Sequence, residues 1–241
     1  MTIFPESRLI HTYIDPLDTL GGGLEIGASA HNPTGLKNCR NVDFSDSMDT
    51  IFKHEEVKMC GRAAPVDIVA YGDEIPLESS SQNYLINLHV FEHLPNPIKA
   101  LLNWHHILKP NGLVYSVIPY RDALDLDKGR PLTTLEHIME DFKNNETCDT
   151  HPIPEGHGKY GHLHLFDKTS YEELISYVNV GIGSKIMFGQ PLFEIIKYVP
   201  TCDKVPNGFV FILRVNKPWG VQLPLFYKDI VEDKWTHLQL S

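Results

Sequence analysis

Short apolar runs alternate with amphipathic stretches through the first half of the chain. The runs are rich in β-branched and aromatic residues and end at Gly, Pro or polar residues, which is typical of buried strands. The predicted strands are residues 23–26, 40–44, 66–71, 84–89 and 113–118. Helices are predicted at 46–58 and 97–108, with a short helix or turn at 3–18. Strands that alternate with helices indicate a parallel sheet covered on both faces.

This regular order changes at two places. Residues 28–37 contain Asn32, Pro33 and Gly35, which are poor helix formers, so the first crossover helix is expected to be shortened or replaced by a loop. After the fifth strand, residues 120–164 form a polar insert. Its expected parts are a helix at 133–142 and a His-rich loop at 151–162, and a helix at 170–178 follows it. Two long strand-like runs, 192–199 and 208–215, are then joined by a short polar turn, which predicts an antiparallel pair.

The predicted fold class is therefore α/β. We expect a doubly wound, mostly parallel seven-stranded sheet with an antiparallel closing strand pair. The chain is expected to form a single domain over residues 1–241. Its core would cover about 20–119 and 165–216, its insert or substrate lid about 120–164, and its C-terminal tail 217–241.

Composition narrows the possible partners. The formal net charge is −10, so nucleic acid is an unlikely partner, because binding it needs phosphate neutralisation by Lys and Arg. No apolar run approaches the roughly 20 residues of a membrane span. The four cysteines form no CxxC pair, which argues against a thiolate zinc site and favours reduced thiols in the cytoplasm. Oligomeric state is left open.

The run Leu24-Glu25-Ile26-Gly27-Ala28 passes from a predicted strand into a tight turn. The acid Asp43 ends the second strand, and the run Ile107–Leu113 precedes the fifth. Together with the first run, these features resemble class I S-adenosylmethionine-dependent methyltransferases of the type-11 branch. The resemblance covers about residues 21–119. A dinucleotide oxidoreductase is less favoured, because no G-x-G-x-x-G follows Glu25.

The resemblance implies S-adenosylmethionine as cofactor. Gly27 would let backbone approach the methionine moiety and Asp43 would accept the ribose hydroxyls, although a simple turn acid is the alternative for Asp43. The family often has an acid where this chain has Tyr71, so the adenine contact is the weakest part of the match. The cofactor-binding residues implied are Glu25, Gly27, Ala28, Asp43, Gly72, Asp73 and His89.

A second group, His89-x-x-Glu92-His93, follows the fourth strand. In some relatives, such as small-RNA 2′-O-methyltransferases and quinone-ring O-methyltransferases, an acid-x-x-Glu-His arrangement and a distant His bind a divalent metal. Imidazole and carboxylate together suit Zn, Mn or Fe. A divalent metal is accordingly a candidate cofactor, with His89, Glu92, His93 and His164 as tentative ligands. A purely structural Glu-His pair is the alternative.

A third group is His157-x-x-x-x-His162-x-His164. If residues 162–164 are extended, His162 and His164 point to the same side. Either could complete a metal site or act as base on a substrate hydroxyl, so His164, His162 and His93 are the catalytic candidates. A solvated His-rich loop is the alternative.

The insert also carries Arg121 and Arg130, which are candidate substrate residues unless they are ordinary surface charges. Many polar donors and acceptors fit a sugar or glycan acceptor better than a hydrophobic ring. The predicted function is O-methyl transfer from S-adenosylmethionine to a hydroxyl of a sugar or glycan. An RNA 2′-O-methyltransferase, a phenol or quinone O-methyltransferase and a non-catalytic binding module are the alternatives.

Overall fold

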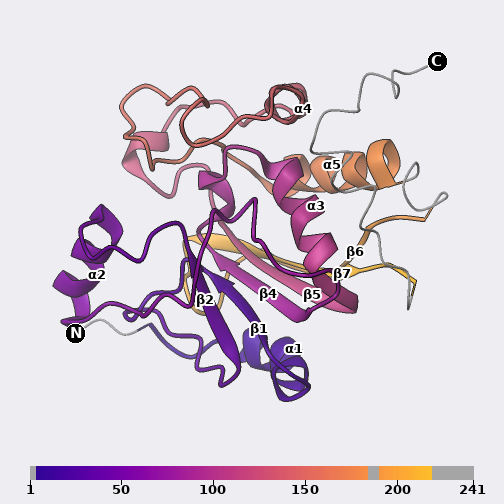
Figure 1. Cartoon of the computed structure of the whole chain (residues 1–241). Helices are drawn as coiled ribbons and strands as arrows, with labels where there is room; N and C mark the ends of the chain where they lie inside the picture. The colour runs from indigo at the N-terminus through magenta and orange to yellow at the C-terminus, as the bar shows by residue number, and fades with distance from the viewer. Residues whose placement is uncertain (1–3, 184–189, 219–241) are drawn as a thin grey trace.

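A computed structural model describes residues 4–183 and 190–218. A seven-stranded sheet crosses the centre of the molecule in the order β3-β2-β1-β4-β5-β7-β6 (Figure 1). Its strands are β1 (Gly23–Ile26), β2 (Cys39–Asp43), β3 (Ile68–Val69), β4 (Gln82–Leu88), β5 (Leu108–Pro119), β6 (Phe193–Val199) and β7 (Gly208–Val215). The first five pair in parallel, and β7 runs antiparallel between β5 and β6. This confirms the predicted fold class.

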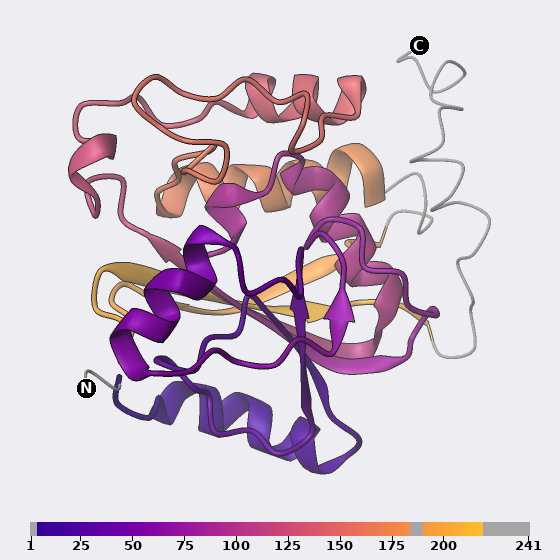
Figure 2. The ribbon, with the colours of Figure 1, turned by 60° about the vertical axis from the view of Figure 1, so that its left-hand side comes forward.

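The helices lie on both faces of the sheet. They are α1 (Arg8–Thr19), α2 (Ile51–Cys60), α3 (Pro97–Ile107), α4 (Leu135–Asn144) and α5 (Lys168–Tyr177), with short 3-10 turns η1 (Phe91–His93) and η2 (Asp125–Asp127) and a π-helical turn η3 (Val178–Gly183). Figure 2 shows α1 on one face, α3 and α5 on the other, and α4 beyond α3 and α5. Among the described helices, none has the length and apolar character needed to cross a bilayer.

Period-two alternation explains why the central strands are apolar on both sides. Leu85 and Val114 face a core that includes Trp104 of α3, whereas Tyr84 and Tyr115 face the core under α1. Successive side chains of a strand point to opposite faces, so a strand covered by helices on both faces is apolar throughout. These two cores hold the carboxyl ends of β1, β2 and β4 in fixed register.

The first crossover, residues 27–38, contains no helix, as predicted from Pro33 and Gly35. Other element boundaries differ from the predictions. The third strand is only Ile68–Val69, because it lies at the sheet edge and pairs with β2 over two residues. The second helix starts after the cap Thr50, so it begins at Ile51. The predicted tail, 217–241, falls almost wholly outside the described residues, which end at 218.

Candidate functional site

The turn after β1 has the backbone geometry that only glycine adopts easily. Gly27 has φ +68°, and a Cβ there would lie 3.1 Å from Cγ2 of Val90. Its N–H donates to the carbonyl of Val42 at 2.8 Å, and the next N–H, of Ala28, donates to Oδ1 of Asn41 at 3.0 Å. A side chain at position 27 would add left-handed strain and crowd Val90. The turn therefore keeps backbone exposed at the end of β1.

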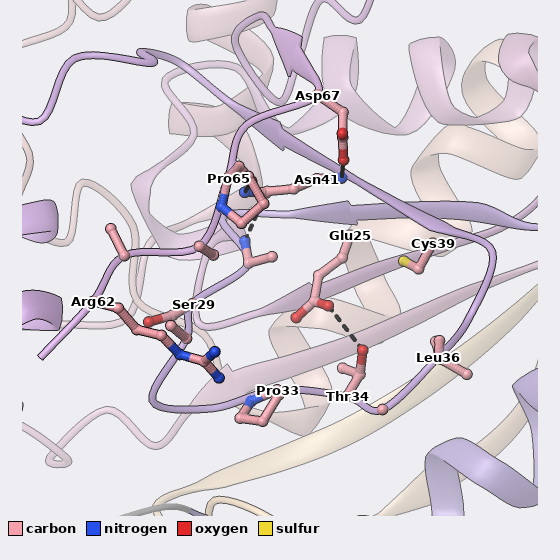
Figure 3. A pocket seen from close by; sticks show the side chains of 15 residues that line it. Glu25, Ser29, Pro33, Thr34, Leu36, Cys39, Asn41, Arg62, Pro65 and Asp67 are labelled. Atoms are coloured by element: carbon pink, nitrogen blue, oxygen red, sulfur yellow. Dashed lines mark hydrogen bonds between the residues drawn. The ribbon is translucent and has the colours of Figure 1, made fainter. Parts of the chain in front are cut away.

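Glu25 projects from β1 into a cavity of about 360 Å³ under the crossover loop (Figure 3). Thr34 of that loop donates its hydroxyl to Oε2 of Glu25 at 3.0 Å. The side chain is almost fully buried, and this burial raises the pKa of Glu25 to about 7 despite the Thr34 bond and the positive charge of Lys204. The carboxyl can therefore be neutral or charged near physiological pH.

Asp43 ends β2, as predicted, and its carboxylate has a cationic partner. Nζ of Lys53 lies 3.4 Å from Oδ2 of Asp43 and 3.3 Å from Oε2 of Glu56. Burial raises the pKa of Asp43, and Lys53 opposes that rise. Lys53 itself is 4% exposed, so the three groups form a buried charged cluster at the end of β2. Ribose hydroxyls at Asp43 would share its oxygens with this ammonium group.

Gly72 and Asp73 follow β3. The carbonyl of Gly72 accepts the indole N–H of Trp104 at 2.7 Å, which holds this turn against α3. Asp73 is buried, and burial raises its pKa to about 6, with Lys99 opposing. Tyr71, at the position where the family often has an acid, is 44% exposed.

The predicted cofactor residues divide between two places. Glu25 and Ala28 line the cavity of Figure 3, together with Ser29, Ala30, Pro33, Thr34, Gly35, Leu36, Cys39, Asn41, Arg62, Ala63, Ala64, Pro65 and Asp67. Asp43, Gly72, Asp73 and His89 are not among its lining residues and follow the carboxyl ends of β2, β3 and β4. The cavity thus opens beside the β1 turn, and the acids expected near ribose and adenine lie elsewhere on that edge.

A buried carboxylate surrounded by imidazoles follows β4. Glu92 of η1 is 1% exposed, and among the described residues neither of its carboxylate oxygens has a hydrogen-bond partner. Oε1 lies 3.8 Å from Nδ1 of His89, 3.7 Å from Nε2 of His93 and 3.7 Å from Nε2 of His162. Burial, with a smaller effect of Asp127, raises the pKa of Glu92 to about 8. Burying a charged carboxylate without a partner is unfavourable in free energy, so a bound proton or a cation would stabilise this geometry.

Hydrogen bonds at Nδ1 fix the orientation of two of these imidazoles, those of His93 and His162. Nδ1 of His93 lies 2.9 Å from the carbonyl of Gly161, which can only accept, so Nδ1 carries the proton. Nδ1 of His162 lies 2.6 Å from Oδ2 of the buried Asp127. Both Nε2 atoms therefore keep lone pairs directed toward Glu92. Burial lowers the pKa of His93 to about 4 and lowers that of His162, which keeps both rings neutral.

Neutral imidazoles held by an outer carboxylate or carbonyl, with lone pairs converging on a carboxylate, are the usual donor set of a divalent metal in proteins. Glu92, His93 and His162 offer ligand atoms that all lie within 4.8 Å of one another. These three residues fit a metal that keeps open positions for water or substrate.

His89 lies at the rim of this group. Its backbone has φ +56°, an uncommon conformation for a residue with a side chain, and such strain is concentrated at functional sites. Its Nε2 is buried and no other described residue offers it a hydrogen bond, while its side chain is 23% exposed. Burial, together with His162, lowers the pKa of His89 to about 4.

His164 does not join Glu92. Residues 162–164 form no strand, and the expectation that His162 and His164 point the same way is wrong. The backbone N–H groups of Leu163 and His164 both donate to the carbonyl of Glu92. The imidazoles of His162 and His164 then contact different partners. Nε2 of His164 lies 3.0 Å from Asp141 instead.

The two candidate substrate arginines differ in their surroundings. Arg130 donates to Oδ1 of Asp127 at 2.6 Å and to the carbonyl of His162 at 3.1 Å, so it supports the residue that orients His162. Arg121 is 45% exposed and pairs with the adjacent Asp122 at 3.4 Å. Of the two, Arg121 has the more accessible guanidinium group.

Sequence reasoning missed two features. Asp127, which is fully buried and binds His162, Arg130 and His157, lies in an insert without periodic pattern and gave no signal. An aromatic group covers the ends of β2 and β3 beside His93. Its members are Phe44, Phe52, Tyr71 and Tyr160, with Phe44 and Tyr160 stacked at 5.0 Å and Phe52 at 6.2 Å from His93. The available signal was Phe44 directly after β2 and Tyr71 two residues after β3.

Comparison with known proteins identifies part of the chain. Residues 19–116 match the type-11 family described as a methyltransferase domain. No curated protein sequence matches the chain.

Among solved structures, a SAM-dependent methyltransferase from Methanosarcina mazei is similar, with 16% identity, a TM-score of 0.49, and coverage of 88% of this chain and 98% of that one. A SAM-dependent methyltransferase from Aquifex aeolicus has 13% identity, a TM-score of 0.45, and coverage of 87% and 94%. At such identities and TM-scores these likenesses do not bear on the chemistry.

The matched segment holds the β1 turn, the acid that ends β2 and the group after β4, and it lies within a sheet whose order and closing strands are those of the class I methyltransferase fold. Residues 19–116 are therefore similar to the methyltransferase domain of the type-11 family, and the sheet around them has the class I methyltransferase fold.

Proposed function

We propose that the protein is an O-methyltransferase that transfers a methyl group from S-adenosylmethionine to a hydroxyl of a sugar or glycan. A divalent metal held by Glu92, His93 and His162 would bind that hydroxyl. The observation that carries the proposal is the buried carboxylate of Glu92, which faces three imidazole nitrogens and has no hydrogen-bond partner within residues 4–183 and 190–218.

The reaction needs a deprotonated hydroxyl in line with the methyl sulfonium. The oxygen forms a bond to the methyl carbon as the carbon–sulfur bond breaks, and S-adenosylhomocysteine leaves. A bound metal would lower the pKa of the hydroxyl and fix its position. In our proposal the proton passes to His89, because its ring is neutral, lies beside Glu92 and keeps an unpartnered Nε2.

The polar character of the insert supports a sugar acceptor. Arg121, Asp122 and Asp125 are exposed after β5, near the edge of the sheet that carries the candidate site, and they offer both donors and acceptors. Hydroxyl-rich ligands are recognised through such groups. The net charge of −10 weighs against an RNA acceptor. All four cysteines are free thiols, which supports action in the cytoplasm.

A phenol or quinone acceptor is the second candidate, and the aromatic group beside His93 favours it. Phe52, Tyr71 and Tyr160 present exposed rings and Phe44 is half-buried; Phe52, which contacts the ring of His93, is 44% exposed. Such rings stack on planar aromatic compounds, and they also pack against the apolar faces of sugars. Methyl transfer from labelled S-adenosylmethionine to matched panels of sugars, phenols and RNA separates these acceptors.

Calorimetry with S-adenosylmethionine is the first test. We expect stoichiometric binding by the wild-type protein and by Glu92→Gln, because Glu92 belongs to the candidate metal group. Methyl transfer should fall by at least about 100-fold in Glu92→Gln, since loss of metal chemistry removes several kcal/mol of transition-state stabilisation. Absence of cofactor binding in the wild-type protein would instead favour the non-catalytic binding module.

A second test concerns the metal. We expect a chelator to abolish methyl transfer without abolishing cofactor binding, and added Mn²⁺ or Zn²⁺ to restore it. Asp127→Asn should weaken metal binding about 10- to 100-fold, because Asp127 orients His162 from behind. Full activity in the presence of chelator would remove the metal from the proposal.

A further inference from the structure

A second cluster of metal-binding side chains lies apart from the Glu92 group. His137 and Asp141 come from α4, His151 from the loop that follows α4, and His164 from the end of the insert. The spacing of His137 and Asp141 is i, i+4, which places both side chains on one face of the helix. Three imidazoles and one carboxylate thus converge from three separate segments of the insert.

The distances around Asp141 match a tetrahedral zinc site. Its carboxylate oxygens lie 3.0 Å from Nε2 of His164, 3.5 Å from Nε2 of His137 and 3.6 Å from Nε2 of His151. Ligands that bind one zinc ion tetrahedrally, at the usual Zn–N and Zn–O lengths, are about 3.3 Å from one another. All four ligand atoms lie within 4.8 Å of one another, so small side-chain shifts would bring them to a common centre.

The hydrogen bond behind His151 supports a cation between these groups. Nδ1 of His151 lies 2.8 Å from the carbonyl of Pro152, which can only accept, so Nδ1 carries a proton. Nε2 of His151 is buried, faces Asp141 and has no hydrogen-bond partner in the part of the chain that the structure describes. In the neutral ring this places a lone pair opposite a carboxylate oxygen, which is unfavourable without a cation between them.

Three of the four side chains of the cluster are closed to solvent, whereas that of His137 is 43% exposed. The side chains of His151 and Asp141 are 2% and 5% exposed, and His164 is fully buried. The rings of His151 and His164 meet at 5.0 Å, and that of His137 lies 5.7 Å from that of His164. A site with four protein ligands is typical of structural zinc, whereas the Glu92 group offers three ligands and would leave a position for water or substrate.

We propose that His137, Asp141, His151 and His164 bind a structural Zn²⁺ ion. The ion would fasten α4 and the loop 145–151 to the segment that carries His162. Leu163 and His164 donate to the carbonyl of Glu92, so holding His164 also holds His162 against the Glu92 group. The zinc ion would therefore position the candidate active site without touching substrate. The proposal stands independently of the methyl acceptor and of S-adenosylmethionine binding.

The test measures the zinc content of the full chain. The purified protein is reconstituted with excess Zn²⁺, and gel filtration then removes the unbound metal before the measurement. In a Glu92→Gln background, which disables the first group, we expect one zinc ion per chain to remain. Adding Asp141→Asn should remove it, and competition with a chromophoric chelator should show zinc affinity reduced by more than about tenfold. Replacement by Co²⁺ should give the intense visible absorption of a tetrahedral site.

Glu140→Gln is the matched control, because Glu140 is the exposed neighbour of Asp141 on the same helix. It should keep the zinc ion and the cobalt spectrum. If Asp141→Asn does not fold, His137→Gln replaces it, since His137 is 43% exposed and its loss leaves the other groups in place.

The wild-type protein should also lose thermal stability on chelation and regain it with Zn²⁺. The proposal is overturned if the Glu92→Gln protein binds no zinc, or if Asp141→Asn or His137→Gln leaves zinc affinity unchanged. A metal-free imidazolium–carboxylate network is then the correct description of the cluster.

Discussion

Replacing Glu25 by Gln is expected to stabilise the protein in a pH-dependent way. Glu25 is 6% exposed, and its pKa in the folded protein is about 7, against an ordinary value of 4.5, because of burial. Below the ordinary pKa, the carboxyl is protonated in both the folded and the unfolded chain. Its ionisation then does not lower the free energy of unfolding. Between the two values, only the unfolded chain releases the proton, so stability falls as pH rises.

The size of the effect follows from this shift. A difference of 7 against 4.5 corresponds to about 3 kcal/mol of unfolding free energy that is lost once the pH exceeds 7. Gln cannot ionise, and its carbonyl can still accept the hydroxyl of Thr34. Relative to wild type, the variant should therefore gain about 3 kcal/mol between about pH 4.5 and pH 8, or roughly 6 to 12 °C in Tm.

Urea denaturation of wild type and Glu25→Gln at about pH 5 and about pH 8 measures the difference directly. Other titrating groups cancel, because the two proteins are compared at each pH. Glu173→Gln, an exposed position on α5, is the control and should show no such change. An equal stability difference at both pH values would refute the assignment of a shifted pKa to Glu25.

Two further substitutions test the edge of the sheet. Gly27→Ala should cost about 1–2 kcal/mol through left-handed strain and should weaken S-adenosylmethionine binding in calorimetry. Gly61→Ala, with φ +78° and open space, should cost a similar amount without affecting the cofactor. Lys53→Met leaves Asp43 and Glu56 buried without their cation and should cost about 3–5 kcal/mol by denaturation. A smaller loss for Lys53→Met at acid pH is expected, whereas a pH-independent loss would point to packing.

Local patterns were enough to predict the architecture. The runs at 84–89 and 113–118 became most of β4 and half of β5, and the predicted antiparallel pair became β6 and β7. The absence of a first crossover helix followed from Pro33 and Gly35, whose effects on the backbone are local. The boundaries of β3 and α2 were less predictable, because pairing at a sheet edge and the choice among several capping residues depend on the rest of the fold.

The candidate site was predictable where it lies on strand ends. Glu92 and His93 lie in η1, the short turn that follows β4, so their place at the carboxyl edge of the sheet was implied by topology. The insert offered no such rule. His162 and His164 are two residues apart, yet one meets Glu92 and the other Asp141, because the chain between them is not a strand and its direction is set by bonds to the carbonyl of Glu92.

Sequence alone was thus sufficient for the fold class, the glycine turn after β1 and the residue types of the candidate chemistry, since these depend on periodicity, backbone preference and position along a strand. It was not sufficient to distribute 13 histidines among their partners. Folding brought Asp127 and Asp141 from the insert against different imidazoles, which formed one group of three candidate ligands and one of four. Such pairings join segments far apart in the chain, and no short-range pattern specifies them.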